Sequence, residues 1–139
     1  MIGIALVSLI VCGLFFPLLI TGLAQAMFPY QANGEIVQLN GRSVGSYLIA
    51  QGFNSSEFFH ARPANDSASG VDPDITVANA LNQTIGISRA VDIPRSSLES
   101  IVYGNTEGTF WIFGSAYVNV LNLNLILIKD YPQIYQNFT

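Results

Sequence analysis

Residues 2–28, IGIALVSLIVCGLFFPLLITGLAQAMF, decide the architecture of this chain. The stretch is almost wholly apolar, and the first charged side chain in the sequence is Glu35. A helix needs about 20 apolar residues to cross roughly 30 Å of hydrocarbon, so this one is long enough to span a bilayer with some tilt. Pro17 lies inside the run and lacks an amide donor, which predicts a mild kink. The sequence therefore predicts a transmembrane helix over residues 1–28.

Two other interpretations of this segment compete with a membrane anchor. The helix could be buried in a soluble protein, but the rest of the chain is too short to enclose a helix that is apolar on all faces. A cleaved signal peptide would fit the small residues Ala24 and Ala26. Against cleavage, the apolar run is longer than the core of a signal peptide, and no basic residue precedes it. We therefore expect an uncleaved anchor.

The composition excludes nucleic acid as a partner. Only 10% of residues are charged, against about 25% in an average soluble domain. The net charge is −4 and the five basic residues are scattered, whereas phosphate binding needs clustered Lys and Arg. The single cysteine, Cys12, lies in the apolar run and can form no internal disulfide.

The flank of the anchor indicates on which side the soluble domain lies. Residues 29–60 hold one arginine and two glutamates, so no positive cluster retains this flank in the cytoplasm. Sequons of the form Asn-x-Ser/Thr begin at Asn54, Asn65, Asn82 and Asn137. They suit an exported surface, although an Asn-rich composition would also produce them. We expect a single-pass protein of the plasma membrane with an extracytoplasmic domain.

After a linker over residues 29–33, residues 34–139 are expected to form that domain. Asn40-Gly41 supplies the positive φ angles of a type I′ turn, which predicts a hairpin of strands 35–39 and 42–51. Ser55 and Ser56 could cap a short helix.

Two helices are predicted in the middle of the domain. The first follows Asp72-Pro73, with Asp72 or Asp74 as its cap. Its predicted buried face consists of Val77, Leu81, Ile85 and Ser88. The second runs from Pro94 to Gly104.

The C-terminal stretch 109–128, TFWIFGSAYVNVLNLNLILI, contains two strand-like runs around Gly114-Ser115. In the second run, Leu121, Leu123, Leu125 and Leu127 alternate with polar Asn122 and Asn124, which is the period of a strand. Strands, then helices, then strands predict a small α+β soluble domain behind a single N-terminal transmembrane helix.

Residues 58–75, FFHARPANDSASGVDPDI, concentrate charge in a chain that is poor in it. Asp66, Asp72 and Asp74 suggest calcium, but Pro73 and the lack of a glutamate at the last position break the EF-hand pattern. His60 is the only histidine, so a zinc shell lacks its ligands, and a small hydrolase using His60 with Asp66 or Asp72 stays an alternative. Neither a GxSxG elbow nor a GxxxxGK[ST] phosphate loop occurs. We interpret the stretch as a docking loop and a helix cap, with no catalytic or metal-binding residue.

Five short motifs follow one another along the chain: GSYLIAQGF at 45–53, FFHARPA at 58–64, SGVDPDI at 69–75, ANALNQ at 78–83 and VNVLNLN at 118–124. In this order they resemble the C subunit of the Kdp-type potassium-transporting P-type ATPase. The matched positions include Leu48 and Ile49. The residues that we carry over as partner-interface or family-motif positions are Gly45, Ser46, Gln51, Phe59, Arg62, Pro63, Ser69, Gly70, Asp72, Pro73, Gln83 and Asn119.

The resemblance implies a non-catalytic accessory subunit without a firmly bound cofactor. Its partners would be a channel-like subunit that selects potassium and a P-type subunit that hydrolyses ATP. Members are commonly described as catalytic chaperones that raise the ATP affinity of the hydrolysing subunit, so ATP would lie at that partner. The alternative function is a secreted or membrane-anchored extracytoplasmic binding domain.

This chain departs from the family pattern at three places. Members are usually longer and carry a further segment that is missing here between residues 64 and 69. Asp74 replaces the histidine of the family pattern, and Gly86 stands where family members commonly have an arginine after the glutamine that corresponds to Gln83.

Overall fold

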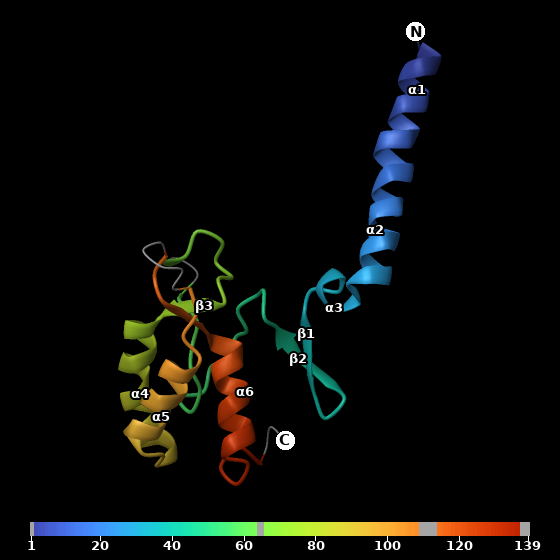
Figure 1. The fold of residues 1–139 in the computed structure, drawn as a ribbon. Coiled ribbons are helices and arrows are strands. Elements are labelled where there is room, and N and C mark those ends of the chain that lie inside the picture. Colours follow the sequence, from blue (N-terminus) through green and yellow to red (C-terminus); the bar gives the residue numbers. More distant parts are fainter. Residues whose placement is uncertain (1, 64–65, 109–113, 137–139) are drawn as a thin grey trace. The chain divides into compact units, whose positions relative to one another are not determined.

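A computed structural model describes residues 2–63, 66–108 and 114–136 (Figure 1). The chain divides into two compact units, Met1–Ile36 and Val37–Thr139. The predicted strand at residues 109–113 lies outside the described residues.

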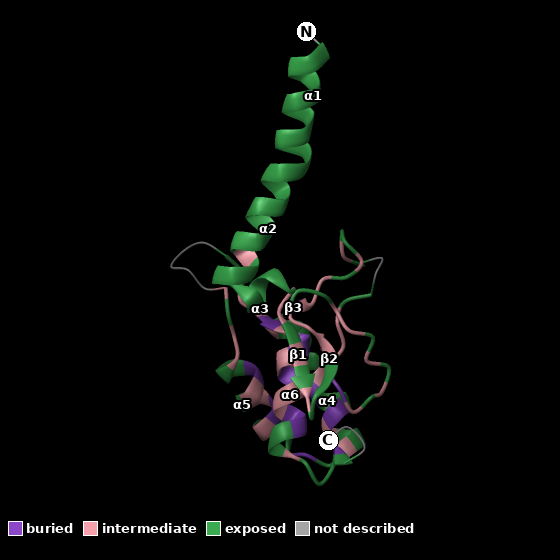
Figure 2. Ribbon diagram, turned by 90° about the vertical axis from the view of Figure 1, so that its right-hand side faces the viewer, coloured by how far each residue is buried: buried purple, intermediate pink, exposed green. Residues whose placement is uncertain are grey.

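The N-terminal unit is dominated by one helix that runs through α1 (Ile2–Ile10), a π-helical turn (Val11–Phe15) and α2 (Phe16–Met27). It is long and apolar enough to cross a membrane, and none of its side chains is buried in the protein (Figure 2). The π turn ends two residues before Pro17, whose ring nitrogen cannot donate to the hydrogen-bond ladder of the helix. Residues 29–33, expected to be a linker, contain one further helical turn, α3 (Pro29–Ala32).

A hairpin of β1 (Ile36–Leu39) and β2 (Arg42–Ser46) follows. Asn40 and Gly41 have φ angles of 51° and 78°, as a type I′ turn requires, so this prediction is confirmed. The second strand is shorter than predicted, because the chain turns back where the Ile49 amide donates to the carbonyl of Ser46. The prediction of a short helix after Ser55 and Ser56 is also wrong, because that segment forms a turn.

The first predicted helix is present, but its start and its buried face differ from the prediction. Asp74–Thr76 forms strand β3, and α4 (Val77–Val91) follows it. Thr76 caps the helix by accepting from the Asn79 amide at 3.3 Å, so neither Asp72 nor Asp74 is the cap. The fully buried positions are Ala80, Thr84 and Ile87. Of the predicted face, Val77 and Leu81 are partly buried against the core, whereas Ile85 is exposed. The second helix, α5 (Arg95–Gly104), ends at Gly104 as predicted and packs against α4.

The predicted second C-terminal strand is wrong. Only Tyr117–Asn119 is extended, as β4, and α6 (Val120–Asp130) follows. Asn119 caps α6 by accepting from the Asn122 amide at 3.2 Å. The buried positions of α6 recur at helical spacing: Val120, Leu121, Leu123, Asn124, Leu127 and Ile128. A run rich in Leu and Asn fits both periods, and the N-cap at Asn119 decides in favour of the helix.

The core of the second unit lies between a two-stranded sheet and three helices (Figure 2). Strands β3 and β4 pair antiparallel, with Ile75 opposite Val118. Phe58 and Phe59 enter this core from the irregular segment that precedes β3, and both are buried. The α+β prediction is therefore confirmed.

Two carboxamide clamps hold that irregular segment against the helices. Asn124 of α6 accepts from the Phe59 amide at 2.8 Å and donates to the Phe59 carbonyl at 2.9 Å. Gln83 of α4 does the same for the next residue, accepting from the His60 amide at 2.8 Å and donating to its carbonyl at 3.0 Å. Among residues 2–63, 66–108 and 114–136 no strand pairs with this segment, and the side-chain amides satisfy its backbone instead.

Replacing Asn124 with Ala is expected to lower the free energy of unfolding by about 2–4 kcal/mol, because the buried amide and carbonyl of Phe59 lose their partners. The measurement is thermal or denaturant unfolding of the full chain in a mild detergent. Asn82→Ala is the control, since Asn82 is exposed on α4 and should change stability by no more than about 0.5 kcal/mol. Equal effects of the two substitutions would contradict the clamp.

Candidate functional site

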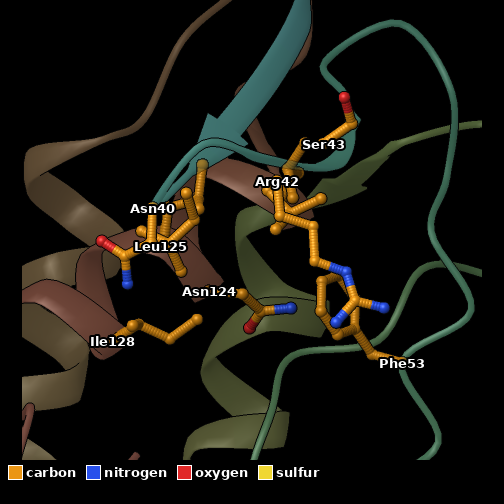
Figure 3. A pocket seen from close by; sticks show the side chains of 10 residues that line it. Asn40, Arg42, Ser43, Phe53, Asn124, Leu125 and Ile128 are labelled. Atoms are coloured by element: carbon orange, nitrogen blue, oxygen red, sulfur yellow. The ribbon is translucent and has the colours of Figure 1, made fainter. Parts of the chain in front are cut away.

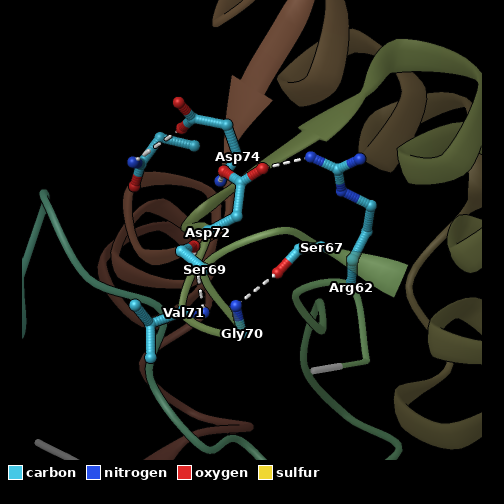
Figure 4. A network of polar contacts seen from close by, with 8 residues as sticks. Arg62, Ser67, Ser69, Gly70, Val71, Asp72 and Asp74 are labelled. Carbon is cyan, nitrogen blue, oxygen red and sulfur yellow. Dashed lines mark hydrogen bonds and ion pairs between the residues drawn. The ribbon is translucent and has the colours of Figure 1, made fainter. Parts of the chain in front are cut away.

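The loops that carry the first three family motifs meet at one surface of the second unit. Arg62 forms an ion pair with Asp72, which joins the loop after Phe59 to the loop before β3 (Figure 4). The two side chains are 39% and 29% exposed, so the pair lies at the surface and is reachable by a partner. An exposed pair of this kind adds at most about 1 kcal/mol to stability.

The loop before β3 is shaped by short local hydrogen bonds (Figure 4). The Gly70 amide donates to the Ser67 hydroxyl at 2.9 Å, and Gly70 has a φ of 70°, which other residues rarely adopt. The Val71 amide donates to the Ser69 hydroxyl at 3.3 Å. Asp72 accepts from the Asp74 amide at 3.1 Å, which turns the chain into the strand. Asp72 therefore both shapes the loop and holds Arg62.

Asn119 connects the first motif to this loop. Its amide group donates to the carbonyl of Tyr47 at 2.9 Å and to the carboxylate of Asp74 at 3.0 Å. Its carbonyl oxygen caps α6. One side chain thus fixes a strand end, a helix start and the loop at Tyr47, which explains a carboxamide at this position.

Three apolar side chains project from the same loops into solvent. Leu48, Ile49 and Val71 are 56%, 50% and 48% exposed. Their loops are joined by a hydrogen bond from the Ala50 amide to the Val71 carbonyl at 2.9 Å. We call these three residues, with Arg62 and Asp72, the motif face. Exposed apolar residues beside an ion pair are typical of a protein-docking surface.

The other carried-over residues support these loops from within. A side-chain carbon at Gly45 would lie 2.7 Å from Gln51, so only glycine leaves room for the Gln51 side chain to lie against this strand. The Ser46 hydroxyl accepts from the Leu48 amide at 3.1 Å. The Pro73 carbonyl accepts from the Val120 amide at 3.0 Å.

Phe59 and Gln83 belong to the clamps and the core, and they do not lie at the motif face. The Pro63 carbonyl accepts from the Asp66 amide at 2.8 Å.

Burial raises the pKa of the Asp74 carboxyl, and the neighbouring carboxylates of Asp72 and Glu107 raise it further. The hydrogen bond from Asn119 and the positive charge of Arg62 act in the opposite direction and do not cancel the rise. In the folded protein, Asp74 therefore holds its proton to a higher pH than it does in the unfolded chain.

The structure gives little support to a small hydrolase that uses His60 with Asp66 or Asp72. His60 lines a shallow, open depression with Ser56, Phe58, Asn82 and Gln83, and no carboxylate lines it within residues 2–63, 66–108 and 114–136. Among these residues no three His, Cys, Asp or Glu side chains are grouped to hold a metal ion.

Sequence reasoning missed two residues. It placed Asn124 on the polar face of a strand, and it passed over Val71, which lies within the SGVDPDI stretch at a position that is not matched to the family. The bidentate role of Asn124 is invisible without the helix on which it lies. Val71 could have been noticed as an apolar residue in an otherwise polar loop.

Asp74→Asn is expected to raise the midpoint of thermal unfolding at pH 7. A group with a raised folded pKa stabilises the fold fully at low pH and loses that contribution as the pH rises through the folded pKa. Asparagine stays neutral, and its carbonyl oxygen can still accept from Asn119. The gain should shrink as the pH falls toward about 4, where the aspartate is itself protonated.

The control for this pH series is Asp66→Asn, because Asp66 is exposed. It should show no comparable pH-dependent gain. A loss of stability in Asp74→Asn at pH 7, or a gain that is the same at every pH, would contradict the assignment.

Comparison with known proteins agrees with the motif order. The family model described as K+-transporting ATPase, c chain (KdpC), matches residues 1–66 and 64–129. The potassium-transporting ATPase KdpC subunit of Gloeobacter violaceus is 36% identical over 163 aligned positions, which cover 84% of this chain and 87% of that protein. The KdpC subunit of Koribacter versatilis is 31% identical over 175 positions, which cover 91% of each chain. That of Clostridium kluyveri is 29% identical over 190 positions, covering 91% of this chain and 90% of its own.

These alignments also show that the relatives are longer than this chain. Their lengths of 163 to 190 positions exceed the 139 residues of this chain, so the relatives carry residues that have no counterpart here. The family model matches in two parts that meet at residues 64–66, which agrees with the segment expected to be missing between residues 64 and 69. The two matched parts together take in both the anchor and most of the second unit, and the chain belongs to the KdpC family, the c chains of K+-transporting ATPases.

Proposed function

We propose that this chain is the non-catalytic accessory subunit of an ATP-driven potassium uptake complex. Its relatives are named as subunits of potassium-transporting ATPases. The observation that carries the proposal is the motif face, where loops holding three family motifs converge through the Arg62–Asp72 pair and expose Leu48, Ile49 and Val71. Such a surface suits docking on another subunit better than turnover of a substrate.

In this proposal the partners are a channel-like subunit and a P-type ATP-hydrolysing subunit. The anchor packs on partner helices in the plasma membrane. The second unit lies on the extracytoplasmic side, and its motif face covers the entrance of the channel-like subunit.

We also propose that the subunit raises the ATP affinity of the hydrolysing subunit. A domain outside the membrane cannot touch cytosolic ATP, so the effect is indirect. The accessory subunit binds more tightly to the conformation of the complex that has the higher ATP affinity, and by linkage it increases the population of that conformation. No nucleotide is required at this chain.

Replacing both Leu48 and Ile49 with Ser tests the docking. We expect at least about a tenfold lower recovery of the channel-like and P-type subunits when the tagged chain is purified in mild detergent, because two anchors of the interface lose their apolar area. In membranes that contain the partner subunits and this variant, the KM of the hydrolysing subunit for ATP should rise, because less of the accessory subunit is bound.

The matched control is Ile85→Ser, since Ile85 is an exposed apolar residue on α4, outside the motif face. It should leave both the recovery and the KM for ATP unchanged. Recovery of the unmodified chain as a lone monomer from cells that express the partners would refute the proposal.

The sidedness is tested with cysteine labelling. Cys12 lies in the anchor and is the only cysteine of the chain, so Ser96→Cys adds one exposed thiol on α5 against a single native one. Ser96→Cys is made in a chain that also carries Cys12→Ala. We expect a membrane-impermeant maleimide to label this chain in intact cells. Labelling that appears only after the membrane is permeabilised would place the domain in the cytoplasm.

A further inference from the structure

A cavity of about 480 Å³ lies between the β1–β2 hairpin and α6 (Figure 3). Cavities of this size are typical of small-molecule sites, which are mostly apolar with a few polar groups that orient the ligand. No residue of the motif face lines it. Its apolar walls come from the hairpin, the loop before Phe58 and α6: Leu39, Val44, Phe53, Leu121, Leu125 and Ile128.

Arg42 is the one charged side chain among the described residues that line this cavity. The side chain extends from the first residue of β2 beside Phe53 (Figure 3). Among the residues that the structure describes, no ion pair or hydrogen bond is made by its guanidinium group. No Asp or Glu lines the cavity either. An unpaired guanidinium at an apolar cavity is complementary to a carboxylate or phosphate, whose oxygens it binds in a bidentate way.

The remaining polar groups fit the same ligand chemistry. Ser43 and Asn40 also line the cavity, and their side chains carry hydrogen-bond donors that suit anionic oxygens. Asn124 also lines the cavity, but its carboxamide is engaged by the backbone of Phe59. The positive charge of Arg42 disfavours a potassium ion at this site. A ligand with an anionic head and an apolar tail satisfies both halves of the cavity.

We propose that this cavity binds an anionic phospholipid, with the phosphate at Arg42 and the upper part of an acyl chain against Phe53, Leu125 and Ile128. The chain places the cavity close to a supply of this amphiphile, because α2 ends at Met27 and Arg42 follows it by 15 residues. Even fully extended, that connection spans no more than about 50 Å, so a membrane-embedded anchor keeps the hairpin near the lipid surface. Tethering of this kind raises the effective concentration of the ligand. The inference is independent of potassium transport and of the motif face.

The test uses the full chain in a non-ionic detergent with a short-chain phosphatidylglycerol that carries a photoactivatable diazirine in one acyl chain. The matched probe is the phosphatidylcholine with identical acyl chains, which lacks the net negative charge. We expect irradiation to label peptides from residues 39–44 and 121–128, with labelling by phosphatidylglycerol several-fold above that by phosphatidylcholine.

Substitutions separate the two halves of the site. Arg42→Gln should lower the labelling by phosphatidylglycerol about tenfold, in line with the loss of one charge-assisted hydrogen-bonded contact, and Arg42→Lys should retain part of it. Leu125→Trp should abolish labelling by filling the apolar half. Arg89→Gln is the control, because Arg89 is exposed on α4 and does not line the cavity. Unchanged unfolding midpoints would show that each variant is folded, and a variant that fails this check is replaced by Leu125→Phe.

Three results would overturn the proposal. The first is equal labelling by the two lipids, and the second is labelling that Arg42→Gln and Arg89→Gln affect alike. The third is full protection by inorganic phosphate at the lipid concentration used, which would identify a phosphate site without an acyl component. Each of these outcomes leaves the docking of the motif face untouched, so it would not count against the proposed function.

Discussion

The irregular segment that contains Phe59 and His60 depends on two side-chain amides. This segment brings two phenylalanines into the core and Arg62 to the surface, and in the part of the chain that the structure describes no strand pairs with it. Asn124 and Gln83, from two different helices, supply that pairing and fix both the depth and the direction of the segment. The helices α4 and α6, the buried aromatic residues and the surface pair of Arg62 with Asp72 are therefore one connected unit.

Much of the fold could be predicted from local chemistry. The anchor follows from its length and apolarity, and the hairpin follows from Asn40-Gly41, whose conformational demands are strong and local. The sequence of α6 misled the prediction because its alternation of Leu and Asn matches a strand. That choice depends on Asn119 acting as a cap and on Asn124 being buried against Phe59, and both are tertiary facts. The cap of α4 is Thr76 and not one of the predicted aspartates for a similar reason. Asp72 pairs with Arg62, and Asp74 accepts a hydrogen bond from Asn119.

The candidate site was predictable in its members and not in its geometry. Motif order named Arg62, Asp72 and Asn119, but spacing along the chain could not show that Asn119 reaches Tyr47 or that Leu48, Ile49 and Val71 share a surface. The missing segment sharpens this point. The two parts matched by the family model meet at residues 64–66, close to where Arg62 pairs with Asp72. The Arg62–Asp72 ion pair and the hydrogen bond of the Gly70 amide therefore flank the point where the two matched parts meet.

The π-helical turn in the anchor has a consequence for its neighbours in the bilayer. A π turn accommodates one residue more than the corresponding stretch of α-helix, and each residue advances an α-helix by about 100° of rotation. Side chains in Phe16–Met27 are thus offset in azimuth from the stripe that Ile2–Ile10 would otherwise continue. A straight neighbouring helix cannot contact both stripes. The anchor helix therefore exposes different sides to its neighbours in the two leaflets of the bilayer.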